Sequence, residues 1–514
     1  MHYEEIHWSL HASWPLLSLI QLLPVLLALL IFLARGRKGL ILFGVGGAFV
    51  EFLLTIALLI GYDEHNSAFQ YAEQFRLVGS FQYHAAVDGV AVLFALLTSF
   101  LTLMVVVYGL TRGVRLIWQF LVIVFLQEAA LVFQYFSLDI VLFAWGSVIQ
   151  MALVAILLRY WSTSVDNTGP RIRFMQFMGI SMVLFLLGTG LLGWHHSRVT
   201  GGAWSFDLMD LAQTPMDIHL QSVVFFLLFY GLAIRIPLFP LHGWFPDVAQ
   251  HGMVAVAPVF LVGVKTGIFG VLRFVFPLLP DAVVLWHNYV VGFAVLGIFY
   301  AAILALMQTN IRRLLAYSVI SHTGLLTIGL FSLDQRAFMG VVLLAVNLGL
   351  ATASMFFSVG FIYHRTNTMF MDRLGGLFDH FPIIGSTFLI AGLSIICMPG
   401  TPGFDAVHLV LEAAIDQFGA LVTILAALGN VVAAGFLLWA FHRTFLAKNQ
   451  KDLKTDMEPP HFLERAIAVS IVVALLALGF YSEPWMLLID KSLGGLGVLF
   501  EHTLPLEGVA GSHG

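Results

Sequence analysis

Four ionisable side chains of this sequence stand inside or beside long apolar runs. Lys265 lies in FLVGVKTGIFGVL, Glu128 in VFLQEAALVF and His322 in YSVISHTGLLTIGLF, and Arg235 opens the segment RIPLFPLHGWFPDV. An ionised group at the centre of a bilayer costs on the order of 2.5–3.5 kcal/mol or more, so such a group is a functional candidate by default. We therefore treat all four as candidates for moving ions, and protons in particular.

The four residue types predict different roles. Desolvation favours a neutral lysine and a nearby carboxylate favours a charged one, so a small rearrangement around Lys265 can load or release a proton. His322 titrates near neutral pH and suits a relay, although a lone buried histidine is more often a satisfied core residue. Arg235 keeps its proton, so it sets a field or pairs statically. For Glu128, a static ion pair and a relay are both open.

A second polar group follows in CMPGTPGFDAVH and the residues after it. His408 and Glu412 are four residues apart and share a helix face, and Asp405 precedes them. They are either exit-side proton groups or the wall of a wet cavity. Asp139 begins another apolar run, where an aspartate is suited to cap a helix.

The sequence argues against redox and hydrolytic chemistry. Its single cysteine, Cys397, cannot form an intrachain disulfide or hold an iron–sulfur cluster or zinc. Glycine fingerprints for dinucleotides, P-loops and nucleophile elbows are missing, and a net charge of −5 without a basic stripe argues against nucleic acid. We expect no cofactor and no metal in this chain, and whether it belongs to an enzyme stays open.

The elements that hold these residues are predicted to be membrane helices. Of the 514 residues 60% are hydrophobic, and the mean hydropathy is +0.94, which predicts an all-α polytopic membrane protein surrounded by lipid. Fourteen apolar segments are expected, at 14–34, 39–61, 88–110, 116–136, 138–158, 173–194, 218–240, 253–276, 285–308, 310–332, 336–363, 382–412, 420–446 and 463–482.

Lysines and arginines orient these segments. Sixteen fall after odd-numbered segments and three after even-numbered ones. Because cytoplasmic loops are enriched in cations, this bias predicts cytoplasmic odd loops and places both termini on the outer, periplasmic side of a bacterial inner membrane.

Two of the predicted helices contain clustered helix breakers. Pro237 and Pro240 interrupt the seventh, and Pro399 and Pro402 interrupt the twelfth. Proline removes a backbone donor and clashes with the preceding turn, so each cluster should unwind its helix. Free backbone groups at membrane depth persist only inside protein or beside water. Ordinary proline kinks are the simpler alternative.

The spacing of the two breaks suggests an internal repeat. They lie five helices apart, so 116–276 and 285–446 can be two copies of one five-helix unit, and an odd number of helices inverts the second copy. Residues 1–115 would add three helices before the repeats, and 447–514 a last helix and tail. Inverted repeats with one discontinuous helix each are a layout of ion-coupled transporters.

Several of these stretches are similar to signatures of the antiporter-like membrane subunits of respiratory complex I. IPLFPLHGWFPDV resembles PLFPFHTWLPDA, LVGVKTGIFGVLRF resembles the lysine helix of that family, and NIRRLLAYSVISHTGLLTIGLFS resembles its tenth helix. LGGLFDHFP and MPGTPGF match two later signatures in order and spacing. The resemblance covers residues 85–445 and is greater to the subunit M, or chain 4, branch than to the L and N branches.

The resemblance implies fourteen helices, two inverted repeats and a central polar axis that carries protons, with Lys265 and His322 at the positions of the family's central lysine and tenth-helix histidine. Four positions depart from the pattern: Gly146 stands for a glutamate, Arg235 for a lysine, Leu348 for a histidine, and Val407 for a glutamate, with Asp405 and His408 beside it. These departures put the entry half of the axis in doubt.

Several functions stay open at this point. The chain can be a proton-translocating subunit of an NADH-quinone oxidoreductase-like complex with a rewired path, in which Glu128 or Asp405 substitutes for a missing carboxylate. It can serve a specialised relative, such as a carbon dioxide or bicarbonate uptake complex or a membrane hydrogenase, or be a scaffold that does not conduct. All of these make it part of a hetero-oligomer, whereas an autonomous transporter is the rival of another class. Protons and sodium are both possible ions.

Overall fold

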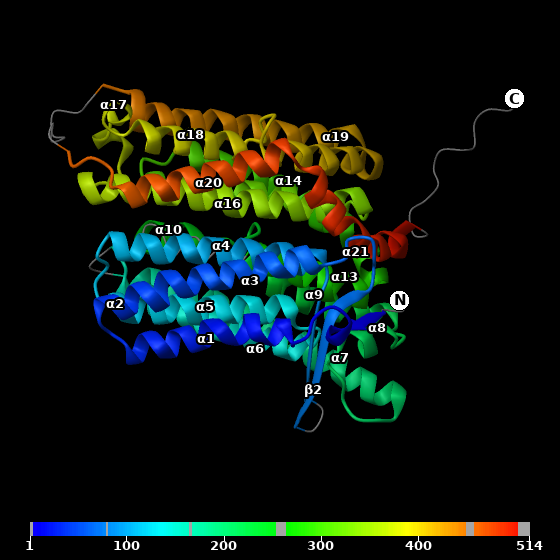
Figure 1. The fold of residues 1–514 in the computed structure, drawn as a ribbon. Coiled ribbons are helices and arrows are strands. Elements are labelled where there is room, and N and C mark those ends of the chain that lie inside the picture. Colours follow the sequence, from blue (N-terminus) through cyan, green and yellow to red (C-terminus); the bar gives the residue numbers. More distant parts are fainter. Residues whose placement is uncertain (1–3, 79–80, 164–166, 253–263, 449–456, 502–514) are drawn as a thin grey trace, which may run out of the picture.

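The computed structural model describes residues 4–78, 81–163, 167–252, 264–448 and 457–501. Long helices run side by side along one direction of the molecule (Figure 1). A small sheet lies at one end, here called the sheet end, and the short helices α2 (Arg37–Gly39), α10 (Phe245–His251) and α17 (Leu377–His380) lie at the opposite end.

Within the described residues, twelve helical segments are long and apolar enough to cross a membrane, which makes this a multi-pass membrane protein. They are α1 (Leu16–Leu33), α2–η2–α3 (Arg37–Gly61), α4 (Gly89–Thr111), α5 (Ile117–Phe136), α6 (Ile140–Tyr160), α7 (Thr168–Thr200), α9 (Ile218–Arg235), α14 (Pro280–Leu306), α15 (Ile311–Phe331), α16 (Gln335–Thr366), α19–η5 (Pro402–Leu446) and α20 (Phe462–Phe480).

The described residues contain twelve such segments where the sequence predicts fourteen, and three of the expected segments account for this difference. Residues 253–263 of the eighth lie outside the described part, which resumes at α12 (Val264–Gly270), η3 (Val271–Val275) and α13 (Phe276–Leu278). The twelfth begins as α18 (Pro382–Ile395), which has only 14 residues, and its remainder joins the thirteenth within α19. Gly419, with φ 75°, bends α19 at the expected boundary. The count of fourteen and the inverted repeats stay predictions.

The sheet was not expected from the sequence, which left 62–87 as an outer loop. Strand β1 (Glu5–His7) pairs in parallel with β2 (Phe69–Val78), and β2 pairs antiparallel with β3 (Phe81–Val87). The buried carboxylate of Glu73 on β2 accepts the amides of Leu17 (3.0 Å) and Ser18 (3.1 Å) at the start of α1. The sheet thereby caps the first membrane helix.

Buried ion pairs connect distant segments at both ends of the bundle. At the opposite end, Glu464 of α20 lies between Arg112, which follows α4, and Arg365 of α16, whose Nη2 is 2.7 Å from the Glu464 carboxylate. At the sheet end, Arg273 of η3 pairs with Asp88 before α4 at 2.8 Å. Helix α21 (Glu483–Glu501) packs against α4 and α16.

Candidate functional site

The first interruption separates α9 from α10. Helix α9 ends at Arg235, and residues 236–244 run as turns before α10 begins at Phe245. The indole Nε1 of Trp244 donates to the carbonyl oxygen of Ile234 at 2.9 Å, and the amide of Leu238 donates to that of Ala233 at 3.0 Å. Protein groups thus satisfy part of the freed backbone, as burial at membrane depth requires.

Arg235 is buried in a cage of neutral groups. Its guanidinium donates to the hydroxyls of Ser147 on α6 (2.5 Å) and Ser181 on α7 (3.1 Å) and to the sulfur of Met182 (3.3 Å), and it lies over the ring of Phe185. Among the residues that the structure describes, no carboxylate forms an ion pair with it. Within that part of the chain, Arg235 is therefore a fixed positive charge without a counter-ion.

Gly146 lies at a close contact between α5 and α6. A Cβ atom at this position would lie 2.7 Å from Cγ of Gln134 and 3.0 Å from Cδ1 of Phe133, both on α5. Gln134 instead accepts a hydrogen bond from Ser147 (2.8 Å) and donates one to Gln150 (3.2 Å). A close helix contact and a neutral polar network therefore surround this position.

Lys265 is buried in α12, with 3% of its surface exposed. Helix α12 packs against α4, α5, α9 and α16, and the lysine stem passes Gly349 of α16, where an added Cβ would lie 3.6 Å from its Cδ. No hydrogen bond or ion pair joins Lys265 to the described part of the chain. Leu348 neighbours Gly349 in sequence and is itself buried.

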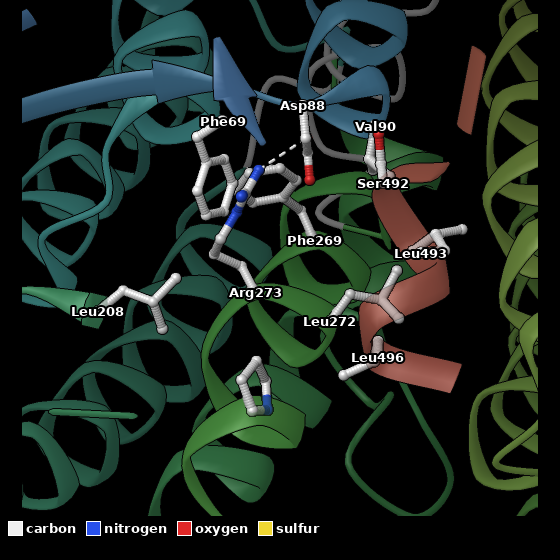
Figure 2. A pocket seen from close by; sticks show the side chains of 11 residues that line it. Phe69, Asp88, Val90, Leu208, Phe269, Leu272, Arg273, Ser492, Leu493 and Leu496 are labelled. Carbon is white, nitrogen blue, oxygen red and sulfur yellow. Dashed lines mark hydrogen bonds and ion pairs between the residues drawn. The ribbon is translucent and has the colours of Figure 1, made fainter. Parts of the chain in front are cut away.

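The sheet-end continuation of the lysine helix is anchored by a cation that was not selected from the sequence. Arg273, two turns beyond Lys265, lies between the rings of Phe69 and Phe269 and points to Asp88 beside a small cavity of about 50 Å³ (Figure 2). The signal that selected Lys265, a cation inside an apolar run, applies equally to Arg273. Its paired and sandwiched guanidinium indicates an anchoring role.

His322 faces the second interruption. Its Nδ1 lies 2.8 Å from the carbonyl oxygen of Ser318, so Nδ1 is the donor and a neutral ring presents a lone pair at Nε2. Nε2 is directed towards the side chain of Asn430 and the backbone at Ile395, but neither forms a hydrogen bond with it among the described residues. A cavity of about 10 Å³ lies between His322 and Asn430, close to the volume that one water needs.

The second interruption is held by two amide side chains. Helix α18 ends at Ile395 and α19 begins at Pro402. Asn347 of α16 donates to the carbonyl oxygen of Ser394 (2.9 Å) and accepts from its hydroxyl (2.5 Å), and Asn430 donates to the carbonyl oxygen of Ile396 (2.9 Å). Lys265, α16 and His322 thus form one buried layer that reaches this break.

The polar residues after the second break, Asp405, His408 and Glu412, lie on the surface of α19. Asp405 is partly exposed, and His408 and Glu412 are exposed. Glu412 pairs with Arg336 at 3.1 Å, and Asp416 pairs with the same guanidinium at 3.0 Å. The structure does not bring these groups together with Lys265 or His322.

Asp139 is a helix cap, as one interpretation of the sequence expected. Its carboxylate accepts the amides of Val141 (2.7 Å) and Leu142 (3.0 Å) at the start of α6.

Glu128 has no cation as its partner among the described residues. It is fully buried on α5 and forms no ion pair within the described residues. Its charged neighbour is a second carboxyl group, Glu51 of α3. Glu51 was not selected from the sequence, although it stands inside an apolar run as Glu128 does.

These features define a class: a polytopic helical membrane protein with two interrupted helices and buried ionisable groups. Residues 137–433 match the family described as NADH:quinone oxidoreductase/Mrp antiporter, TM, and the chain belongs to this family. It is 30% identical to NADH-quinone oxidoreductase subunit M of Rickettsia prowazekii over 459 residues, covering 87% of this chain and 90% of that protein. It is 29% identical over 496 residues to NAD(P)H-quinone oxidoreductase chain 4 1 of Nostoc, covering 92% and 89%.

Solved structures show the same fold. A chain of respiratory complex I from Thermus thermophilus is 26% identical, with a TM-score of 0.85 and 94% and 99% of the two chains covered. A chain of the Mrp complex from Dietzia sp. is 18% identical, with a TM-score of 0.83 and coverage of 94% and 98%, which supports the fold alone. The chain is thus an antiporter-like membrane protein of the complex I and Mrp type.

Proposed function

We propose that this chain translocates protons as an antiporter-like subunit of a complex I-type or related energy-coupled membrane assembly. The observation that carries the proposal is Lys265, a buried lysine without a fixed partner among the described residues, in a helix packed against α16. A lysine held in this way exchanges its proton readily, because neither a permanent counter-ion nor bulk water fixes its charged form.

His322 supplies the next group of the proposed path. Its Nδ1 is held by the Ser318 carbonyl, so Nε2 is the atom that takes up or gives away a proton. Nε2 faces Asn430 and the backbone of the second interruption, beside room for about one water. We propose that protons pass between Lys265 and this interruption through α15 and α16.

The first repeat must contribute differently from the second. Arg235 cannot release its proton, and the position of Gly146 has no space for a carboxylate. This arrangement also favours the second candidate function, a scaffold subunit that does not conduct. Carbon uptake, a membrane hydrogenase and sodium as the ion remain open proposals within the same family.

Replacing the lysine decides between conduction and scaffolding. We expect Lys265→Ala to abolish coupled proton movement in membrane vesicles or proteoliposomes, read with a pH-sensitive dye, while the assembled complex is retained on native gels. Lys491→Ala, at an exposed position of α21, is the matched control and should move protons normally. Undiminished proton movement by the Lys265→Ala protein would leave the scaffold role.

The partners and the orientation belong to the proposal as well. Relatives with this fold are named as parts of complex I, of an Mrp complex and of a membrane-bound sulfane sulfur reductase. We propose a hetero-oligomer in a bacterial inner membrane, with both termini outside and the inverted repeats 116–276 and 285–446. Identification of co-purifying chains tests the assembly. Labelling of single cysteines introduced at the two ends, after replacement of the buried Cys397, tests the orientation.

A further inference from the structure

Two buried carboxyl groups interact across helices α3 and α5. Helix α3 precedes the first proposed repeat unit, and α5 begins it. Glu51 lies on α3 and Glu128 on α5, and neither has any exposed surface. The two groups interact electrostatically. All four carboxyl oxygens are buried and lack a hydrogen-bond partner among the described residues.

Hydroxyl groups of α4 complete this cluster. Thr102 has no exposed surface, its Oγ1 has no hydrogen-bond partner within the described residues, and its hydroxyl is directed towards Glu128. One turn away on each helix, Thr55 of α3 and Ser99 of α4 share a hydrogen bond of 2.7 Å. The cluster therefore offers oxygen atoms from three helices and no cation from the described residues.

Electrostatics restricts the charge that such a pair can carry. Two carboxylates without a counter-ion in a dry environment cannot both be ionised, because desolvation and mutual repulsion each favour the protonated form. A shared proton removes one charge and supplies a donor for the second carboxyl group. Among the described residues, Glu51 is the charged group that acts on Glu128. Helices α1, α4, α6 and α12 also pack against α5 and add none, Lys265 of α12 included.

We propose that Glu51 and Glu128 form a second proton-binding site of this protein, a pair of buried carboxyl groups that together hold at least one proton. The ligand is the proton, and Thr102 is the hydroxyl that completes the site. Proton binding here stands independently of the proposed function. Delivery of this proton to Lys265 rests on that function.

A line of hydroxyl groups connects the site with the lysine helix. Tyr135 lies two turns beyond Glu128 on α5, and its hydroxyl faces that of Thr98, one turn from Thr102 on α4. The Tyr135 ring packs against Phe269, one turn from Lys265, with ring centroids 5.3 Å apart. This line of hydroxyl groups ends at an aromatic contact one turn from Lys265 on the lysine helix.

Infrared difference spectroscopy of the full-length protein in its membrane complex tests the site. A protonated carboxylic acid has a carbonyl stretch that shifts in D₂O, and we expect such a band to persist above neutral pH in the wild type. Glu51→Gln and Glu128→Gln should each lower the pH at which the band disappears, because the remaining acid loses a negative neighbour. The double variant Glu51→Gln/Glu128→Gln should lack the band altogether.

Glu483→Gln, which replaces an exposed carboxylate of α21, is the matched control and should leave the band unchanged. Glutamine keeps the size and a donor of the protonated acid, so retained assembly of the variants is part of the expected result. A band that survives in the double variant would overturn the proposal. A band that titrates differently in sodium chloride and in choline chloride at constant ionic strength would also overturn it, and would assign the pair to sodium.

Measurements of proton transport distinguish a failure of this site from a failure of the proposed function. If Lys265→Ala stops proton movement and the carboxyl band remains, the two inferences stand independently. If Glu128→Gln also slows proton movement, the connection through Tyr135 and Thr98 is supported. An unchanged rate in Glu128→Gln contradicts the connection and leaves proton binding to be judged by the spectra alone.

Discussion

At the scale of single residues, Arg235 and Gly146 are two positions where this chain departs from the sequence pattern that it resembles. At the first interruption the cation is an arginine held by the hydroxyls of Ser147 and Ser181, which accept hydrogen bonds but carry no charge. A carboxylate partner would change the net charge around Arg235 when it took up a proton, whereas hydroxyl partners leave that net charge constant. Arg235 therefore acts as a permanent field source, and the titratable groups of the described layer are Lys265 and His322.

Gly146 makes this change testable through stability. We expect Gly146→Ala to destabilise the protein by about 1–3 kcal/mol, because the new Cβ would overlap Gln134, whose side chain is already held by Ser147 and Gln150. Thermal unfolding in detergent measures the effect. Gly179→Ala on α7 is the control, since no atom lies within 4 Å of its added Cβ, and it should be neutral or slightly stabilising. Equal unfolding temperatures for the two variants would contradict tight packing at Gly146.

At the scale of elements, a histidine holds the sheet to the bundle. His84 of β3 is buried, with Nε2 at 2.8 Å from Glu5 of β1 and Nδ1 at 2.5 Å from Asp207, which precedes α8 (Leu208–Ala212). Burial lowers the pKa of His84, but the hydrogen bonds and charges of Asp207 and Glu5 outweigh it, so the net change in this pKa is upward. The protonated ring is therefore the form that joins these elements.

The raised pKa of His84 determines whether the stability of the folded protein rises or falls with pH. Because the folded-state pKa lies above the unfolded value, the stabilisation is complete below about pH 6.5 and is lost as pH rises through the folded pKa. We expect the wild-type unfolding temperature to fall over this range and the fall to be smaller in His84→Asn. His65→Asn, exposed in the nearby loop, is the control. An identical pH profile for His84→Asn and the wild type would refute the assignment.

The sheet also shows where prediction from the sequence stopped. Membrane helices are predictable because lipid forces each apolar segment to satisfy its own backbone, so local composition is sufficient. Strand β1 pairs with β2 across more than sixty residues, and no local pattern announces such a contact. Pairing partners of buried groups are equally nonlocal. The sequence selected Glu128 as an isolated acid, but its neighbour Glu51 is apparent only once α3 and α5 have both packed against α1 and α4.

At the scale of the whole molecule, one buried carboxylate of α20 joins helices from different parts of the sequence. Glu464 has no exposed surface and lies between Arg112 and Arg365, so three segments that are far apart in the sequence meet at one charge. Arg365 also donates to the carbonyl oxygens of Glu458 (2.7 Å) and Pro459 (3.1 Å), which precede α20. The position of the last membrane helix thus depends on this triad.

Removing the central charge should loosen the whole assembly of helices. Glu464→Gln removes the carboxylate that contacts both guanidinium groups and leaves only the more distant charge of Glu458. Breaking a buried pair in this way costs roughly 3–5 kcal/mol. We expect a large fall in unfolding temperature and earlier proteolysis before α20. Glu412→Gln, in the half-exposed cluster around Arg336, is the matched comparison and should cost about 1 kcal/mol or less because water screens that pair. If both variants unfold alike, the triad is not what holds α20, and the apolar contacts of α20 with α16 and α18 must hold it instead.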